Sequence, residues 1–358
     1  MNFKSQKSLD KKIINILKNK YNKKDVNKFY SIIKISRKND FGYINPVKYF
    51  FNSPPEIINF TKELLKKRYD KFKFDKKIIE NIFDYLKKNK NNNSIKSANF
   101  IRENIYSFKE DYFKKLSEYL PIRYNLTYKY LKKTYNFDKH KDLIDLGAGT
   151  NDLGTVIVKN NKKIKVIGID ILQYNSKKKI KNLSYKKQPK SFDVPKKEID
   201  IIILNGVLHH VDYLGLDILL NNLNNKLKIN GKIILFEDTW DFSSPKKFVD
   251  TDAKANTKFL LLSKKYPNKI HAINIFLEWF GILLVRNYKK MSLPYNFLSL
   301  EEWKIIFKNK NLKFVKNLNI GFFKNTLHRQ SYNVIVFKKD KKKKVNNFLF
   351  IENYFKKL

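Results

Sequence analysis

Residues 142–154 read Asp-Leu-Ile-Asp-Leu-Gly-Ala-Gly-Thr-Asn-Asp-Leu-Gly, and residues 166–170 read Val-Ile-Gly-Ile-Asp. The apolar run 143–146 ends in a glycine-rich turn, as a buried parallel strand does where it enters a loop. Asn151 and Asp152 can cap the helix that we expect next. Residues 166–169 predict a second strand, which Asp170 closes with a carboxylate. A βαβ unit with glycines in its first turn and an acid ending its second strand binds a cofactor that carries a nucleoside.

The glycine spacing indicates the kind of cofactor. A dinucleotide fingerprint has the spacing G-x-G-x-x-G. Gly147 and Gly149 supply its first two glycines, but Asp152 stands at the third position, where its carboxylate would repel a pyrophosphate. The turn therefore favours a ligand that lacks phosphate and carries an ammonium and a carboxylate.

The run Asp145-Leu-Gly-Ala-Gly-Thr150 resembles the first motif of the class I S-adenosylmethionine (SAM)-dependent methyltransferases, in particular those with a type 11/12-like domain. The resemblance covers roughly residues 120–338. It implies an α/β fold, with a Rossmann-like, doubly wound sheet of seven strands whose last strand is antiparallel, and this chain adds a helical N-terminal region. The family often has glycine where Asn151 stands. Asparagine tolerates a left-handed backbone better than most residues, so we expect the turn to form.

The same resemblance implies which residues hold SAM. Asp145 and the turn Gly147-Ala148-Gly149 should hold the methionine part, and Asp170 should accept both ribose hydroxyls. The other residues expected at the cofactor are Arg123 or Tyr124 near the carboxylate, Ile171 or Leu172 beside the adenine ring, Gln188 or Asp193 near the adenine amine, and Asn205 at the end of the fourth strand. A surface arginine on a capping helix is the alternative interpretation of Arg123.

Two histidines follow the predicted fourth strand. Residues 200–205 predict that strand, and the loop after it reads Gly-Val-Leu-His-His-Val. Ligands of parallel sheets bind at the carboxyl ends of strands, so His209, His210 and Glu237, which ends the fifth strand, are candidate catalytic residues. One histidine would face the substrate and the other would pack under the loop, while Glu237 would orient a substrate group or form a structural salt bridge. A sulfonium is already a good leaving group, so we expect no fixed triad and no metal.

The remaining patterns predict the other elements. Residues 183–185 predict a third strand, 232–238 a fifth, and 312–315 with 331–337 a closing antiparallel pair. Pro121 is expected to begin a helix, and Asn230-Gly231 to form a tight turn before the fifth strand. Ser299 and Glu302 form a capping box. The long connection 240–300 is expected to roof the acceptor pocket, with His271, Trp279 and Tyr295 as candidate lining residues.

The length and composition of the chain indicate how its domains are organised. We expect a basic helical N-terminal region over residues 1–95, a methyltransferase domain over 96–340 with the lid insertion 240–300, and a basic C-terminal tail over 341–358. The chain has 358 residues, 42% of them hydrophobic, which is enough for a sizeable core. It contains no cysteine, so disulfides and a cysteine nucleophile are excluded. Its first 20 residues are charged throughout and its longest apolar run is too short to span a bilayer, so we expect a cytoplasmic protein without a membrane partner.

The formal net charge of +43 has two interpretations. It can indicate a polyanionic partner such as RNA, bound through a lysine-rich surface. It can also reflect an A/T-rich genome, because lysine, asparagine, isoleucine, phenylalanine and tyrosine are all abundant. Only six of the 76 basic residues are arginine, the better reader of phosphates and bases, which favours the second interpretation.

Three functions remain open on these grounds. The leading one is SAM-dependent methylation of an oxygen or nitrogen, most simply on a small molecule. The second is methylation of RNA, including caps, with help from the basic N-terminal region. The third is a non-catalytic binding subunit with a methyltransferase fold. The acceptor and the oligomeric state do not follow from the sequence.

Overall fold

The computed structural model covers most of the chain between the two termini. The residues that it describes are 24, 26, 27, 45–70, 76–92, 94–106, 109–137, 142–171, 180–187, 198–211, 213–240, 247–283, 294–324 and 330–340. Most of the first 44 residues of the predicted basic helical region, and the predicted tail over 341–358, lie outside them. Among the described helices, none is both long and apolar enough to cross a membrane.

Seven strands form one mixed sheet in the order β3-β2-β1-β4-β5-β7-β6. They are β1 (Asp142–Leu146), β2 (Lys165–Asp170), β3 (Leu183–Lys187), β4 (Ile199–Asn205), β5 (Leu227–Asp238), β6 (Leu312–Gly321) and β7 (Tyr332–Lys339). Strands β1 to β5 pair in parallel, and β7 lies antiparallel between β5 and β6. The predicted doubly wound sheet with an antiparallel last strand is confirmed. The strand order reverses between β1 and β4, which is where such sheets bind ligands.

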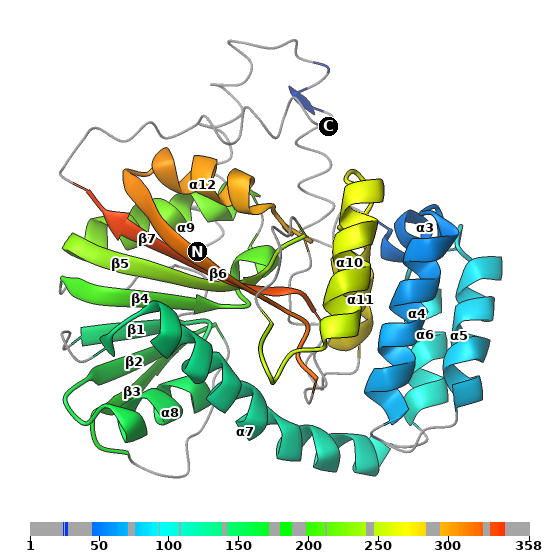
Figure 1. Ribbon diagram of the computed structural model, residues 1–358, viewed down its shortest axis with the longest axis horizontal. Helices are drawn as coiled ribbons and strands as arrows, with labels where there is room; N and C mark the ends of the chain where they lie inside the picture. The colour runs from blue at the N-terminus through cyan, green and yellow to red at the C-terminus, as the bar shows by residue number, and fades with distance from the viewer. Residues whose placement is uncertain are drawn as a thin grey trace.

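Helices cover both faces of the sheet because its central strands are apolar on both sides. Ile202 and Leu204 of β4 face α9 (Tyr213–Lys226) and α12 (Leu300–Lys308) in one apolar cluster. Ile201 and Ile203 point the other way, into a cluster with α7 (Lys109–Thr134) and α8 (Asp152–Asn160). Figure 1 shows these two layers on either side of the strands.

A separate apolar core lies beside the sheet and joins distant parts of the sequence. It contains residues of α3 (Pro46–Phe51), α4 (Pro55–Asp70), α5 (Lys76–Lys88), α6 (Ser94–Tyr106), α10 (Ala253–Lys265) and α11 (Ala272–Ile282). We call these six helices the helical cap; Figure 1 shows them together at the right of the sheet. The buried rings of Phe50 in α3 and Phe276 in α11 stack with centroids 4.0 Å apart. The described N-terminal helices therefore share one core with the predicted lid.

Two local predictions were wrong. Pro121 does not begin a helix but lies inside α7, which bends along its length in Figure 1. A proline removes one backbone hydrogen bond, and a helix accommodates that loss by bending. The turn predicted at Asn230-Gly231 is instead an irregularity within β5, where the pairing with β4 skips from Leu227 to Lys232. Asn230, with a left-handed φ of 66°, lies in the part of β5 that this skip leaves out of register with β4.

Candidate active site

The glycine turn after β1 folds back onto the end of β2. Gly147 and Gly149 have φ angles of 75° and 53°, a region that favours glycine. A Cβ on Gly147 would lie 2.2 Å from a methyl carbon of Val207, whereas a Cβ on Gly149 would meet nothing within 4 Å. The N–H groups of Gly147 and Ala148 donate to the carbonyl of Ile169 at 2.7 and 3.1 Å. The turn is thus packed on one side and open at Gly149.

Two carboxylates lie at this turn. Asp170 Oδ2 accepts a hydrogen bond from the N–H of Gly149 at 2.8 Å, so the acid that ends β2 meets the turn that ends β1. Asp145 is buried, and its Oδ2 has no hydrogen-bond partner among the described residues. Burial, and then the charge of Asp170, raise the pKa of Asp145 to about 7. A buried carboxyl oxygen without a partner is suited to receive a cationic group from a ligand.

Asn151 adopts the left-handed conformation that its place in the motif requires, with a φ of 65°. It precedes α8 as predicted, but the expected capping bond is absent because its side chain makes no bond to the first turn. Its Nδ2 donates to the carbonyl of Ser184 at 3.4 Å instead. The amide occupies space that Gly154 and Gly168 leave free, since added Cβ atoms there would lie 2.6 and 2.3 Å from Asn151 Oδ1.

α7 brings two predicted side chains to the ends of β1 and β4. Arg123 Nη2 lies 3.7 Å from where a Cβ on Gly206 would be. Burial opposes the charge of Arg123, yet its pKa is raised by the phenols and acids nearby, Asp238 among them. Burial raises the pKa of Tyr124, and Asp152 and Asp145 add to that effect, which places this ring at the glycine turn.

Glu237 organises the loop that carries the two histidines. Its Oε1 accepts hydrogen bonds from the N–H groups of Val207 and Leu208 at 2.8 and 2.7 Å. Its Oε2 lies 2.7 Å from Nδ1 of His209. An ionised carboxylate only accepts hydrogen bonds, so Nδ1 carries the proton. Glu237 is 1% exposed and directs both oxygens at this loop, so it orients His209.

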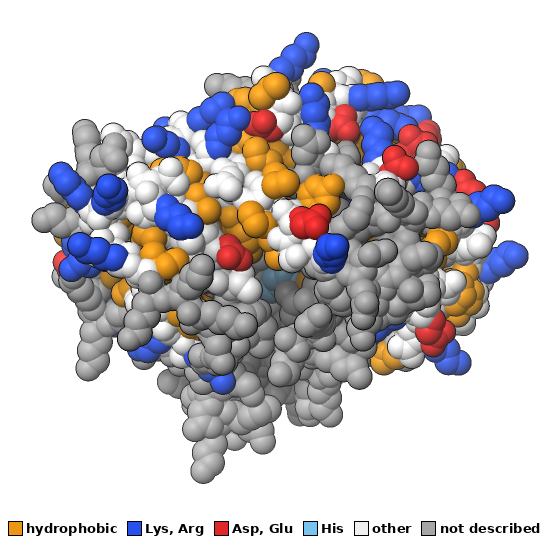
Figure 2. Space-filling view, turned by 90° about the horizontal axis from the view of Figure 1, so that it is seen from below, with side chains coloured by type: hydrophobic (Ala, Val, Ile, Leu, Met, Phe, Trp, Pro, Cys, Tyr) orange, Lys and Arg blue, Asp and Glu red, His pale blue; other side chains and the backbone are white. Residues whose placement is uncertain are grey.

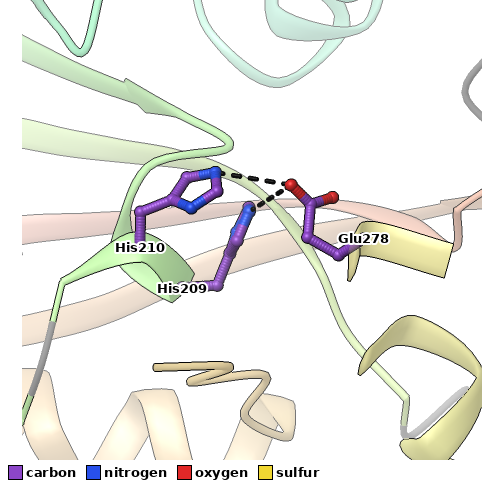
Figure 3. Close-up of side chains that lie close together, drawn as sticks. All are labelled: His209, His210 and Glu278. Carbon is purple, nitrogen blue, oxygen red and sulfur yellow. Dashed lines mark ion pairs between the residues drawn. The ribbon is translucent and has the colours of Figure 1, made fainter. Parts of the chain in front are cut away.

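His209, His210 and Glu278 converge at the end of β4 (Figure 3). The Nε2 atoms of His209 and His210 lie 3.7 and 3.4 Å from Glu278 Oε1. His209 is buried and stacks on Phe297 with centroids 4.8 Å apart, whereas His210 is more exposed. Burial opposes a charge on His209, but Glu237 and Glu278 raise its pKa well above the usual range. Burial likewise opposes the charge of Glu278, whose pKa is held below its usual range by the two histidines.

Glu278 was not among the residues singled out from the sequence. It comes from α11, which is apolar apart from this one acid and Asn274. Burying a single carboxylate in an apolar helix costs free energy unless a partner compensates its charge. An isolated acid in such a helix therefore indicates a buried partner, and this signal could have identified Glu278. Gln330 donates to its other oxygen, Oε2.

The other predicted residues are placed as follows. Asn205 ends β4 with its Oδ1 buried and without a hydrogen-bond partner in the described structure, and Ile171 is 49% exposed beside Asp170. Trp279 and Tyr295 are buried with the helical cap, and His271 Nε2 hydrogen-bonds to the hydroxyl of Tyr49 there. Leu172, Gln188 and Asp193 lie outside the described residues.

The site can hold a ligand that brings both charge and hydrogen-bond donors. The open face of Gly149 and the partnerless oxygens of Asp145 and Asn205 belong to the ends of β1 and β4, with Asp170 beside them. These features fit an ammonium and the hydroxyls of a sugar. In Figure 2 a histidine side chain is visible, recessed in a hollow of the surface.

Comparisons with known proteins point to one family. A family model described as a methyltransferase domain matches residues 112–317. No curated protein matches the sequence at a significant level. Solved structures with a similar fold include the pyocyanin biosynthetic protein PhzM, at 12% identity over 60% of this chain and 55% of that one, with a TM-score of 0.40.

A second structure is a mitomycin 7-O-methyltransferase, at 12% identity over 57% of this chain and 50% of that one, with a TM-score of 0.37. A third is human N-acetylserotonin methyltransferase in complex with SAM, at 15% identity over 67% of this chain and 59% of that one, with a TM-score of 0.42. The chain thus spans between 50% and 59% of the length of these three structures.

Proposed function

The chain belongs to the methyltransferase domain family, whose methyl donor is S-adenosyl-L-methionine, and from that premise we propose that it methylates an oxygen or nitrogen of a small-molecule acceptor. The observation that carries the proposal is the hydrogen bond between Asp170 Oδ2 and the N–H of Gly149, which joins the carboxyl ends of β1 and β2 next to the point where the strand order reverses. It supports a single crevice in which a bare backbone turn and a strand-end carboxylate act together.

The donor would be held by residues from both sides of this crevice. Asp170 would accept the ribose hydroxyls, and the turn Gly147-Ala148-Gly149 would lie against the methionine part. The partnerless Asp145 oxygen suits the ammonium, and Arg123 suits the carboxylate. Asn205, Ile171, and Gln188 or Asp193 complete the proposed cofactor residues. When bound, SAM supplies an electrophilic methyl group on a sulfonium.

The protein's own part in the reaction is mainly to position the acceptor. His210, the more exposed histidine, would hydrogen-bond the acceptor heteroatom or take its proton at Nε2. Glu237 fixes the Nδ1 proton of His209, which leaves Nε2 of that ring directed at Glu278. We propose that Glu237 acts through His209 as a positioning residue.

A small acceptor fits this site better than an RNA strand does. His209 is 4% exposed and the side chain of Glu278 is 13% exposed, where α11 of the helical cap meets the histidines that follow β4. An acceptor that reaches these groups has to enter between the cap and the sheet. The basic residues are almost all lysine, with six arginines among 76, which does not favour a nucleic-acid partner.

Titration calorimetry with SAM and S-adenosylhomocysteine tests the proposal. We expect the wild-type chain to bind both, and Asp170→Ala to bind at least about 100-fold more weakly, because charge-assisted bonds to the ribose are lost. Asp84→Ala, on the exposed face of α5, is the matched control and should bind like wild type. A folded wild-type chain without affinity for SAM would favour the non-catalytic subunit, and unchanged binding by Asp170→Ala would remove the assigned site.

A further inference from the structure

His209, His210 and Glu278 converge so closely that a positive charge between them would stabilise the arrangement. The ligand-type atoms of the three side chains all lie within 4.8 Å of one another (Figure 3). Nδ1–H of His209 donates a hydrogen bond to Glu237, so a neutral ring would turn the lone pair of Nε2 toward Glu278 Oε1, 3.7 Å away. Two acceptors facing each other in a buried site repel unless a proton or a metal cation lies between them.

Two of these side chains, His209 and Glu278, are also held in place by neighbours. Glu237 fixes the tautomer of His209, and Phe297 stacks on its ring with an interplanar angle of 18°. Gln330 donates to Glu278 Oε2, which leaves Oε1 directed at the histidines. Carboxylates and amides in these positions are what orient the ligands of metal centres and raise their basicity.

We propose that His209, His210 and Glu278 bind a divalent transition-metal ion of the zinc class. Two imidazoles and one carboxylate form a donor set that zinc and its neighbours accept, whereas magnesium and calcium prefer oxygen ligands alone. Zinc–ligand bonds of about 2.0–2.1 Å place tetrahedral ligand atoms about 3.3 Å apart. The observed 3.4 and 3.7 Å are close to this spacing, and the widest pair would have to approach by at most about 1.5 Å.

The role of the ion rests on the proposed function. Three protein ligands leave one position of a tetrahedral ion for water or for the heteroatom of the acceptor. With the ion bound, Nε2 of His210 is a ligand and no longer a base, so the ion in its place would fix the acceptor at the end of β4. The ion would also tie α11 of the helical cap to the sheet. Methyl transfer itself does not require a metal, so we expected none from the sequence. The third ligand, Glu278, was also not recognised there, because it stands alone among apolar residues.

Metal binding by the full chain tests this inference. Protein stripped with a chelator and dialysed is titrated with zinc chloride in competition with a chromophoric chelator. We expect one zinc ion to bind with submicromolar affinity, His210→Asn to weaken it more than about 100-fold, and Glu237→Gln to weaken it about 10- to 100-fold. The chain has no cysteine, so no thiol site competes. His271→Asn is the matched control, because His271 is bonded to Tyr49 in the helical cap, and it should leave zinc affinity unchanged.

Two further measurements keep the outcome decisive. Cobalt bound to the wild-type chain should give the visible absorption of a four- or five-coordinate ion, a readout that needs no variant. Equal zinc affinity in wild type and folded His210→Asn, or only the weak spectrum of hydrated cobalt, would overturn the site. A SAM titration of the stripped protein separates the two proposals: SAM binding without zinc binding removes only the metal, and zinc binding without SAM binding removes only the methyl donor.

Discussion

At the scale of single residues, Asn151 shows what the sequence could and could not predict. Its left-handed conformation followed from the motif and from the tolerance of asparagine for positive φ. The place of its side chain did not follow, because the space that it fills is created jointly by Gly154 in α8 and Gly168 in β2. Such three-body packing depends on how the elements pack, which local patterns do not encode.

The contact between Asn151 and Gly168 leads to a double-mutant prediction. Gly168→Ala places a Cβ 2.3 Å from Asn151 Oδ1, so we expect it to lower the free energy of unfolding by about 1–3 kcal/mol. Asn151→Gly accepts the same φ without strain and removes the clash, so Gly168→Ala should cost much less in that background. Urea unfolding of the four proteins measures the coupling. Equal costs of Gly168→Ala in both backgrounds would contradict this packing.

Asp145 should make stability depend on pH in a defined direction. Its folded pKa of about 7 exceeds the ordinary aspartate value of 3.8, so the folded state holds the proton more tightly than the unfolded state does. Stability should therefore fall as pH rises from about 4 to about 7, by up to about 4 kcal/mol at roughly 1.4 kcal/mol per unit. Asp145→Asn should abolish this part of the fall and be the more stable protein at pH 8. Urea unfolding at pH 4.5, 6 and 8 measures it, and parallel pH curves for both proteins would refute it.

At the scale of elements, the parallel strands were the most predictable features. A buried strand is a short apolar run between turn signals, and the centres of β1, β2 and β4 were located on that basis. α7 was less predictable. Proline is common at the first position of a helix, so the pattern around Pro121 suggested that a helix begins there. In the structure the helix continues through Pro121, which the local pattern does not indicate. Glu278 was missed for a related reason: its partners lie on a loop almost 70 residues earlier.

The capping box of α12 gives a prediction at this scale. Ser299 Oγ accepts from the N–H of Glu302 at 3.1 Å, and Glu302 Oε2 accepts from the N–H of Ser299 at 2.9 Å. Ser299→Ala should therefore lower the free energy of unfolding by about 1 kcal/mol. Ser263→Ala in α10 is the control: its hydroxyl donates to the Leu260 carbonyl within its own helix, and we expect a change within about 0.5 kcal/mol. Equal effects of the two substitutions would argue against a stabilising cap.

At the scale of the whole molecule, the helical cap is the feature that the order of the sequence conceals. Its helices come from residues 46–106 and 253–282, and Phe50 and Phe276 stack across the junction between these two parts. Composition pointed to a helical N-terminal region but could not say what it packs on, because apolar stripes do not identify their partners. Because α10 and α11 are inserted in the chain between β5 and β6 of the sheet, we expect the cap and the sheet to unfold together.

Phe50→Ala tests that cooperativity. Phe50 is fully buried against Phe276, so its truncation should cost about 3–5 kcal/mol. Trp279 reports on the cap core and Trp303 on the sheet core, so each can be followed in a background where the other one and Trp240 are replaced by phenylalanine. We expect both probes to move to the same lower urea midpoint, because α10 and α11 are anchored in the sheet domain at both ends of their insertion. Ile305→Ala, at a side chain 51% exposed on α12, should leave both midpoints nearly unchanged. A shift of the Trp279 transition alone would mean that the cap unfolds as a separate domain, and the acceptor site between cap and sheet would then open without unfolding of the sheet.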